Sequence, residues 1–155
     1  MPMIDVTLPE GALTEEAKAA VADRLTTTLL EAEGAADIPF SREITLVYFD
    51  ERPAGSIYVA GEARSDARYR LLVTIPEGSI TDDAKKAELV DNLTRDILEA
   101  EGAGGEEAAF RVWVFIHEVP DGHWAGGGRI FRLRDIVRLA KSGGERLPDR
   151  PSVTA

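Results

Sequence analysis

The residue best suited to chemistry in this sequence is Pro2, which directly follows the initiator Met1 and begins a strand-like alternation of residues. Aminopeptidases remove the initiator methionine when the next residue is small, and proline qualifies, so we predict that the mature chain begins with a secondary amine. The pKa of an α-amino group is about 8 in water. Modest burial or a nearby cation lowers that pKa towards neutrality, where the amine can accept a proton. Two other interpretations stay open: Pro2 is only a signal for methionine removal, or Met1 is retained and the nitrogen is an amide without basicity.

An internal repeat provides the elements that must position this amine. Residues 7–14 (TLPEGALT) return as residues 74–81 (TIPEGSIT), and residues 30–35 (LEAEGA) return as residues 98–103 with the same letters. The spacing is 67 positions for the first match and 68 for the second, so the second copy carries one extra residue within its helix. Repetition this exact indicates two copies of one supersecondary unit.

Each copy is predicted to form a strand followed by a helix. In the first strand, Ile4, Val6 and Leu8 alternate with polar residues, which is the period of a half-buried strand, and residues 71–75 repeat the pattern. Thr14 and Thr81 are the predicted N-caps of the two helices. Gly34 and Gly102 are the expected left-handed stops at their ends.

A second strand is predicted to complete each copy, at residues 43–49 and 110–116, because both stretches are rich in β-branched and aromatic residues. Parallel strands joined by a helix form a right-handed βαβ unit. We therefore predict an α/β (α+β) fold in which two βαβ units pair edge to edge as a four-stranded mixed sheet, with both helices on one face. The other face would be uncovered, which favours a symmetric oligomer.

The predicted domain organisation is a single domain over residues 1–141. It comprises the two repeats, 2–61 and 69–128, and a C-terminal segment, 129–141, expected to hold a strand end and a short helix. Residues 142–155 are rich in Gly, Pro and Ser and are predicted to be a flexible tail.

Composition limits the classes of function. The chain has 155 residues and a net charge of −10, which opposes general binding to nucleic acid or anionic lipid. It has no cysteine, so disulfides, thiolate chemistry and cysteine-based zinc sites are excluded. No apolar run is long enough to span a membrane. We expect a cytoplasmic protein that binds neither nucleic acid nor membranes.

With the repeat in place, the chain resembles the tautomerase superfamily, and specifically a fused, two-copy version of 4-oxalocrotonate tautomerase, over residues 2–131. The motifs that carry the resemblance are the proline after methionine, the Glu-Gly before each helix, and the stretch FRVWVFIHEVPDGHWAGGG at residues 110–128. The family's amino-terminal proline falls on Pro2. Its substrate-binding arginine falls on Arg111, and the aromatic residue of its hairpin falls on Trp124.

The resemblance implies a cofactor-independent tautomerase or isomerase, assembled as a homotrimer, that acts on a small carboxylate substrate without a metal. Pro2 would be the general base, Arg111 would bind the substrate carboxylate or enolate, and Trp124 would wall the pocket and exclude water. Structural alternatives stay open, because Arg111 could pair with a helix acid and Trp124 could plug a subunit interface.

Departures from the family pattern keep other functions open. The arginine that the family places just after Glu-Gly is Ala12 in one copy and Ser79 in the other, and Tyr69 stands where the second copy would place its own proline. One alternative is a decarboxylase or hydratase, related to the chloroacrylate dehalogenases, that uses protonated Pro2 as an acid. Dehalogenation itself is disfavoured, because the paired arginines of those enzymes are Pro76 and Ser79 here. Another alternative is a non-catalytic oligomeric binding protein.

Overall fold

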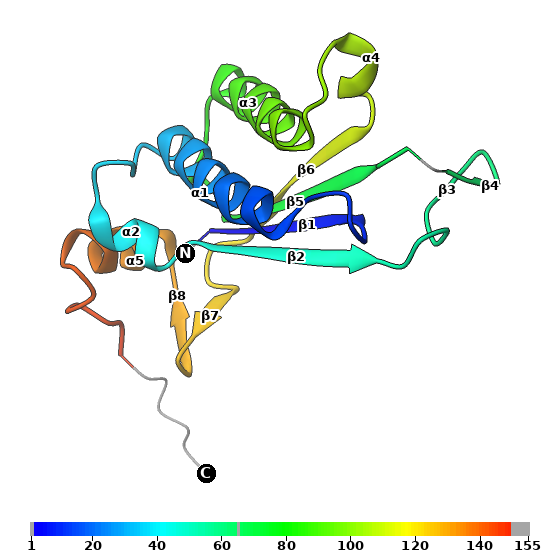
Figure 1. The fold of residues 1–155 in the computed structure, drawn as a ribbon. Helices are drawn as coiled ribbons and strands as arrows, with labels where there is room; N and C mark the ends of the chain where they lie inside the picture. The colour runs from blue at the N-terminus through cyan, green and yellow to red at the C-terminus, as the bar shows by residue number, and fades with distance from the viewer. Residues whose placement is uncertain (1, 65, 150–155) are drawn as a thin grey trace.

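A computed structural model describes residues 2–64 and 66–149 of the chain (Figure 1). Two βαβ units form the body of the protein, as the sequence predicts. The first unit comprises β1 (Met3–Pro9), α1 (Glu15–Ala32) and β2 (Leu46–Arg52). The second comprises β5 (Tyr69–Pro76), α3 (Asp83–Glu101) and β6 (Val112–Val119).

The strands form one mixed sheet in the order β2-β1-β5-β6. Strands β1 and β2 are parallel, β5 and β6 are parallel, and the two units meet through the antiparallel pair of β1 and β5. Alternation sorts the side chains, so that Ile4, Val6 and Leu8 of β1 are fully buried beneath the helices. The predicted sheet is confirmed, and the main core lies between the sheet and one helical layer.

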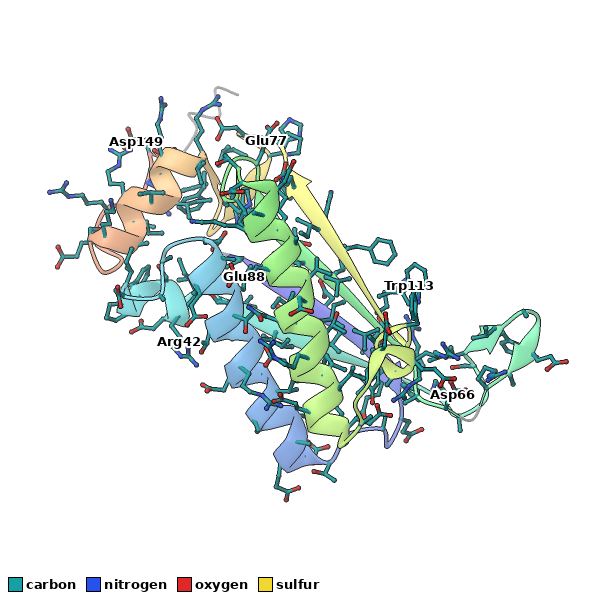
Figure 2. The ribbon with its side chains drawn as sticks, turned by 90° about the horizontal axis from the view of Figure 1, so that it is seen from above. Arg42, Asp66, Glu77, Glu88, Trp113 and Asp149 are labelled. Atoms are coloured by element: carbon teal, nitrogen blue, oxygen red, sulfur yellow. The ribbon has the colours of Figure 1, made fainter. Side chains whose placement is uncertain are left out.

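Helices α1 and α3 lie side by side across the same face of the sheet (Figure 2). They contain 18 and 19 residues, so the extra residue of the second copy does lie within its helix. Thr14 caps α1 by accepting a hydrogen bond from the amide of Ala17 at 3.1 Å. The predicted cap at Thr81 is wrong: Asp82 caps α3, because its carboxylate accepts from the amide of Ala84 at 2.8 Å. A carboxylate in this place also favours the helix dipole.

The predicted bounds of the second strands, 43–49 and 110–116, are wrong at both ends, because β2 and β6 begin and end about three residues later. Short helices precede them, namely α2 (Pro39–Glu43) and α4 (Glu106–Ala109). A proline at the first position of α2 starts a helical turn where propensity alone favours a strand. The strands then continue for as long as their neighbours β1 and β5 offer backbone partners.

The face of the sheet away from α1 and α3 carries large apolar side chains that are exposed in the single chain. They are Leu46 and Tyr48 on β2 and Trp113 and Phe115 on β6. Over this face, at one side, lies a groove of about 760 Å³ that also contains three arginines, Arg52, Arg68 and Arg70. A sheet face of this composition matches the expected surface for association with other copies of the chain.

The remaining elements decorate the ends of the sheet. A small hairpin of β3 (Tyr58–Val59) and β4 (Glu62–Ala63) joins the two units, and a second hairpin pairs β7 (Trp124–Gly126) with β8 (Arg129–Phe131). Helix α5 (Leu133–Lys141) follows β8 and packs against α2 (Figure 1).

Of the predicted tail, residues 142–149 belong to the described part of the chain. Residues 150–155 lie outside it, as does Met1. Within the described part of the tail, the carbonyl of Pro148 accepts a hydrogen bond from Arg129 at 2.8 Å. None of the helices in residues 2–64 and 66–149 is long and apolar enough to cross a membrane.

Candidate active site

Pro2 is buried where the chain enters β1. Its carbonyl accepts a hydrogen bond from the amide of Leu46 at 3.2 Å, which ties the residue to the start of β2. The ring lines a cavity of about 250 Å³ between the end of α1, α2 and α5. The one residue that the sequence singled out as a base therefore lies in a hollow that can hold a small molecule.

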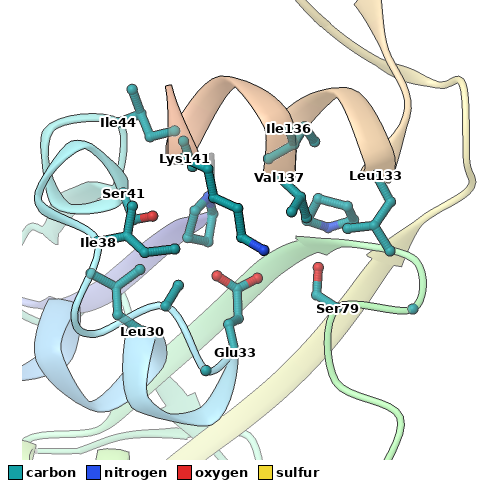
Figure 3. Close-up of a pocket in the computed structure, with 16 residues that line it drawn as sticks. Leu30, Glu33, Ile38, Ser41, Ile44, Ser79, Leu133, Ile136, Val137 and Lys141 are labelled. Atoms are coloured by element: carbon teal, nitrogen blue, oxygen red, sulfur yellow. The ribbon is translucent and has the colours of Figure 1, made fainter. Parts of the chain in front are cut away.

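The walls of this cavity are mostly aliphatic. Helix α5 covers one side and the segment from α1 through α2 covers the other (Figure 3). Besides Pro2, the apolar residues that line it are Leu30, Ala35, Ile38, Ile44, Pro76, Leu133, Ile136, Val137 and Ala140. Such walls exclude water and disfavour the charged form of an amine, which lowers the pKa of an amine placed among them.

Four polar side chains interrupt the apolar lining. Ser41 lies on α2, Glu33 directly follows α1, Ser79 follows the turn after β5, and Lys141 ends α5. Figure 3 shows the carboxylate of Glu33 and the amine of Lys141 pointing toward one another, and the Ser79 hydroxyl lies beside the Glu33 carboxyl. Burial raises the pKa of the half-buried Glu33 carboxyl, and the positive charge of the amino terminus, followed by the Ser79 hydroxyl, partly opposes this. The cavity thus combines a cation, an acid and two hydroxyls.

Helix α5 is held over the cavity by two aspartates near its first turn. Asp135 accepts from the amide of Arg132 at 3.1 Å and from the Arg138 guanidinium at 2.6 Å. Asp121 accepts from the amide of Leu133 at 2.9 Å. Backbone hydrogen bonds are the largest cause that lowers the pKa of both carboxyls, followed by their arginine partners. Both aspartates are ionised near neutral pH, and their hydrogen bonds hold the start of α5 in place. We call α5 the lid of the cavity.

Trp124, predicted to wall the pocket, lies next to that lid rather than in the cavity lining. It is 6% exposed and belongs to a second apolar cluster with Phe131, Ile136 and Leu139, against which Met3 also packs. Ile136 touches both the cluster and the cavity, and Met3 follows Pro2 directly. Within one chain, Trp124 is therefore linked to the cavity through its cluster with Ile136 of α5.

Arg111 lies at the opposite end of the sheet from Pro2. Register places Met3 beside Thr74, and Thr74 beside His117, whereas Arg111 precedes Val112 at the start of β6. The two residues are therefore roughly 20 Å apart at about 3.3 Å per strand residue. The structure of one chain does not bring them together.

The guanidinium of Arg111 is occupied at that distant end. It makes two hydrogen bonds of 2.8 Å to the carboxylate oxygens of Glu101 and donates to the carbonyl of Ala67 at 3.1 Å. Tyr69 lies beside this ion pair and is 2% exposed. Burial, followed by the negative charge of Glu101, raises the pKa of the Tyr69 hydroxyl. Within one chain, Arg111 therefore pairs with an acid of a helix, which is the structural alternative that the sequence left open.

Sequence reasoning missed two residues of the cavity, Glu33 and Lys141. Glu33 belongs to the repeated LEAEGA stretch, whose glycine drew attention as a helix stop. Lys141 ends an arginine-rich helix that indicated no particular partner. A usable signal existed for Glu33, since its counterpart in the second copy is Glu101 and the arginine opposite Glu101 has the apolar counterpart Ile44 in the first copy.

Comparison with protein families matches a model of tautomerase enzymes to residues 2–67 and again to residues 71–134. The two matched ranges correspond to the two βαβ units and cover most of the chain. Comparison with curated protein sequences found no significant match.

Solved structures share this fold over most of the chain. A fused 4-OT described as the F6 wild-type asymmetric trimer is 26% identical, with a TM-score of 0.69 over 83% of this chain and 94% of that chain. N1, a member of the cis-3-chloroacrylic acid dehalogenase family, is 22% identical, with a TM-score of 0.72 over 92% and 96%. Macrophage migration inhibitory factor from Toxoplasma gondii is 16% identical, with a TM-score of 0.65 over 83% and 99%. The last two likenesses concern the fold alone.

Proposed function

Because this chain belongs to the tautomerase family, we propose that it is a cofactor-independent keto-enol tautomerase whose general base is the amine of Pro2. The observation that carries the proposal is the burial of Pro2 in a mostly aliphatic cavity. Aliphatic walls favour the neutral amine, and a neutral amine near neutral pH can accept a proton from an enol hydroxyl. Removal of Met1 is the chemical precondition.

A small enol or 2-keto acid is the proposed substrate class. The cavity of about 250 Å³ is smaller than the ~300–1,000 Å³ typical of drug-sized ligands. Ser79, where the family places an arginine, lines this cavity together with Lys141. We assign the carboxylate-binding role to Lys141, because its ammonium is the cation that α5 presents to the site. One cation suits one carboxylate.

A homotrimer is the proposed assembly, by analogy with the fused 4-OT trimer and because the open sheet face exposes Tyr48, Trp113 and Phe115. In the trimer, the predicted substrate contact of Arg111 requires that it come from a neighbouring subunit, given its distance from Pro2 in one chain. Trp124 would act by holding α5 in place. Light scattering tests the assembly, and a monomer at micromolar concentration would contradict it.

The test of function is the ketonisation of an arylpyruvate enol by protein whose intact mass shows that Met1 is absent. Pro2→Ala should lower kcat/KM by at least ~100-fold, the usual contribution of a positioned base. Lys141→Met should raise KM with little change in kcat, as expected for loss of an anchor. Circular dichroism and light scattering control for folding and assembly. Full activity of a correctly folded Pro2→Ala variant would refute the proposal.

A second candidate is a decarboxylase or hydratase in which protonated Pro2 acts as an acid. Glu33 favours it, because a carboxylate in the same cavity stabilises an ammonium. Release of CO2 from a 3-oxo acid, or addition of water to an acetylenic acid, would distinguish this activity from tautomerisation. Absence of both products on a panel of such acids would remove it.

A further inference from the structure

We propose that Glu33 is a second proton-transfer residue of the Pro2 site, which donates a proton to the substrate carbon while Pro2 removes one from the substrate oxygen. This inference rests on the proposed tautomerase function. It assigns a catalytic role to a residue for which the sequence predicted only the end of a helix.

The first support is the position of Glu33. It lines the same cavity as Pro2 and is half-buried at the end of α1. Figure 3 shows its carboxylate pointing into the cavity rather than out to solvent. Apart from Pro2, Lys141 on α5 is the other ionisable group among the described residues that line the cavity, and the turn after β5 contributes the hydroxyl of Ser79. A carboxyl so placed is within reach of a molecule that also contacts Pro2.

The second support is a comparison of the two halves of the chain. Glu101 occupies in the second half the place that Glu33 occupies in the first, and it is fixed by two hydrogen bonds from Arg111. The position equivalent to Arg111 in the first half is Ile44, which lines the cavity. Among the described residues, Glu33 consequently has no ion-pair partner within 4 Å. One acid is locked in a structural pair, and its counterpart is available for proton transfer.

The third support is electrostatic. An ionised carboxylate beside an amine would hold the amine protonated and impair it as a base. Burial raises the pKa of the Glu33 carboxyl despite the opposing positive charge of the amino terminus, which makes its protonated form accessible nearer to neutral pH. Pro2 and Glu33 then titrate as a coupled pair, and the active form is the one that carries a single proton on Glu33 and none on Pro2. Lys141 keeps the net charge of the site suitable for an anionic substrate.

The proton balance closes within the pair. During ketonisation, the enol O–H bond breaks, its proton passes to the Pro2 nitrogen, and its electron pair forms the carbonyl. The electron pair of the carbon-carbon double bond takes the proton of the Glu33 carboxyl and forms the new C–H bond. The ammonium of Pro2 then returns a proton to the Glu33 carboxylate, directly or through water, and the site is restored without any other reactant.

The experiment compares wild type, Glu33→Gln and a matched control, Glu31→Gln, in Met-free trimeric protein. Glu31 is an exposed acid on the same helix and does not line the Pro2 cavity. We expect Glu33→Gln to lower kcat by about 100-fold or more with a change in KM of only a few-fold. Glu31→Gln should behave as wild type. The uncatalysed ketonisation rate is subtracted at every pH.

The pH profile separates proton transfer from a structural role. Wild type requires one proton on the pair, so its kcat should be bell-shaped, whereas the residual activity of Glu33→Gln should only rise with pH, since Pro2 alone titrates. Added formate should partly restore Glu33→Ala and leave Glu33→Gln unchanged, because only alanine opens space for a small acid.

Two outcomes separate the failure of this inference from failure of the proposed function. Loss of activity in Pro2→Ala together with an unchanged kcat and an unchanged bell in Glu33→Gln would overturn the role of Glu33 alone. Retention of activity in Pro2→Ala would overturn the proposed function. A Glu33→Gln profile that keeps its alkaline limb at reduced kcat, without rescue of Glu33→Ala, would also refute proton donation by Glu33.

Discussion

The ion pair of Arg111 and Glu101 permits the sharpest test of which residues serve stability and which serve chemistry. The pair is bidentate, with both N–O distances at 2.8 Å, and the two side chains are only 16% and 18% exposed. Removal of either partner leaves a half-buried charge without its counter-ion. Each of Arg111→Met and Glu101→Gln should therefore lower the free energy of unfolding by about 2–3 kcal/mol.

The double variant should lose less than the sum of the two single variants, because neither charge is then left alone. We expect a coupling energy of about 1–2 kcal/mol, larger than the ~0.5 kcal/mol typical of exposed pairs. Urea unfolding at one fixed protein concentration measures it, since an oligomer's stability depends on concentration. Additive single effects, with a coupling below about 0.5 kcal/mol, would refute the reasoning.

Kinetics on the same variants decides the role of Arg111 in substrate binding. If a neighbouring subunit's Arg111 contacts the substrate, Arg111→Met should raise KM at least tenfold while Glu101→Gln leaves KM unchanged. Equal KM values in the two variants, at matched fractions of folded protein, would show that the arginine serves the fold alone.

Two further predictions concern α5, the lid of the Pro2 cavity. Gly144→Ala should destabilise the protein by about 1–3 kcal/mol, because a Cβ there would lie 2.7 Å from the ring of Phe40 on α2. In Gly143→Ala the added Cβ meets nothing within 4 Å, so this variant should cost only about 1 kcal/mol for its positive φ. Thermal unfolding compares the two variants. The hydrogen bonds that lower the pKa of Asp135 should stabilise the protein above about pH 4 and be lost as pH falls further, so wild type should lose more stability on acidification than Asp135→Asn. Equal pH slopes in the two proteins would contradict the second prediction.

Periodicity predicted the strands because alternation is a local consequence of burial on one face. Repetition predicted that two similar units are present. The alternation of Ile4, Val6 and Leu8 is what a strand with one covered face requires, and the repeat shows that two such units share a sheet. The details that were predicted wrongly, a helix cap and the strand bounds, depended on which of several neighbouring residues caps a helix or starts a helical turn. Asp82 supplied a carboxylate one residue after the predicted cap Thr81, and Pro39 started a helical turn before β2.

The candidate site was only partly predictable. Pro2 could be singled out because it directly follows a methionine, and the proposed removal of that methionine would leave its nitrogen as a free amine. Lys141 is brought to the Pro2 cavity by the packing of α5 on α2, a contact between segments about a hundred residues apart for which the sequence carries no local signal. Glu33 follows α1, and its signal lay in the comparison with Glu101 of the second copy. Register in the sheet, likewise, decides that Arg111 and Pro2 occupy opposite ends.

The two ends of the sheet differ in how the same repeat unit is filled. At the second-half end, Tyr69 fills the position equivalent to Pro2, and the large pair of Arg111 and Glu101 closes the space beside it. At the first-half end, a proline replaces the tyrosine and Ile44 replaces the arginine, so the same framework leaves a cavity. Tyr69 is an internal residue without a free amine, and a second cavity in its place would cost packing without adding a base. The two halves therefore differ here at two positions, Pro2 against Tyr69 and Ile44 against Arg111, and these differences leave a cavity at one end of the sheet and a filled space at the other.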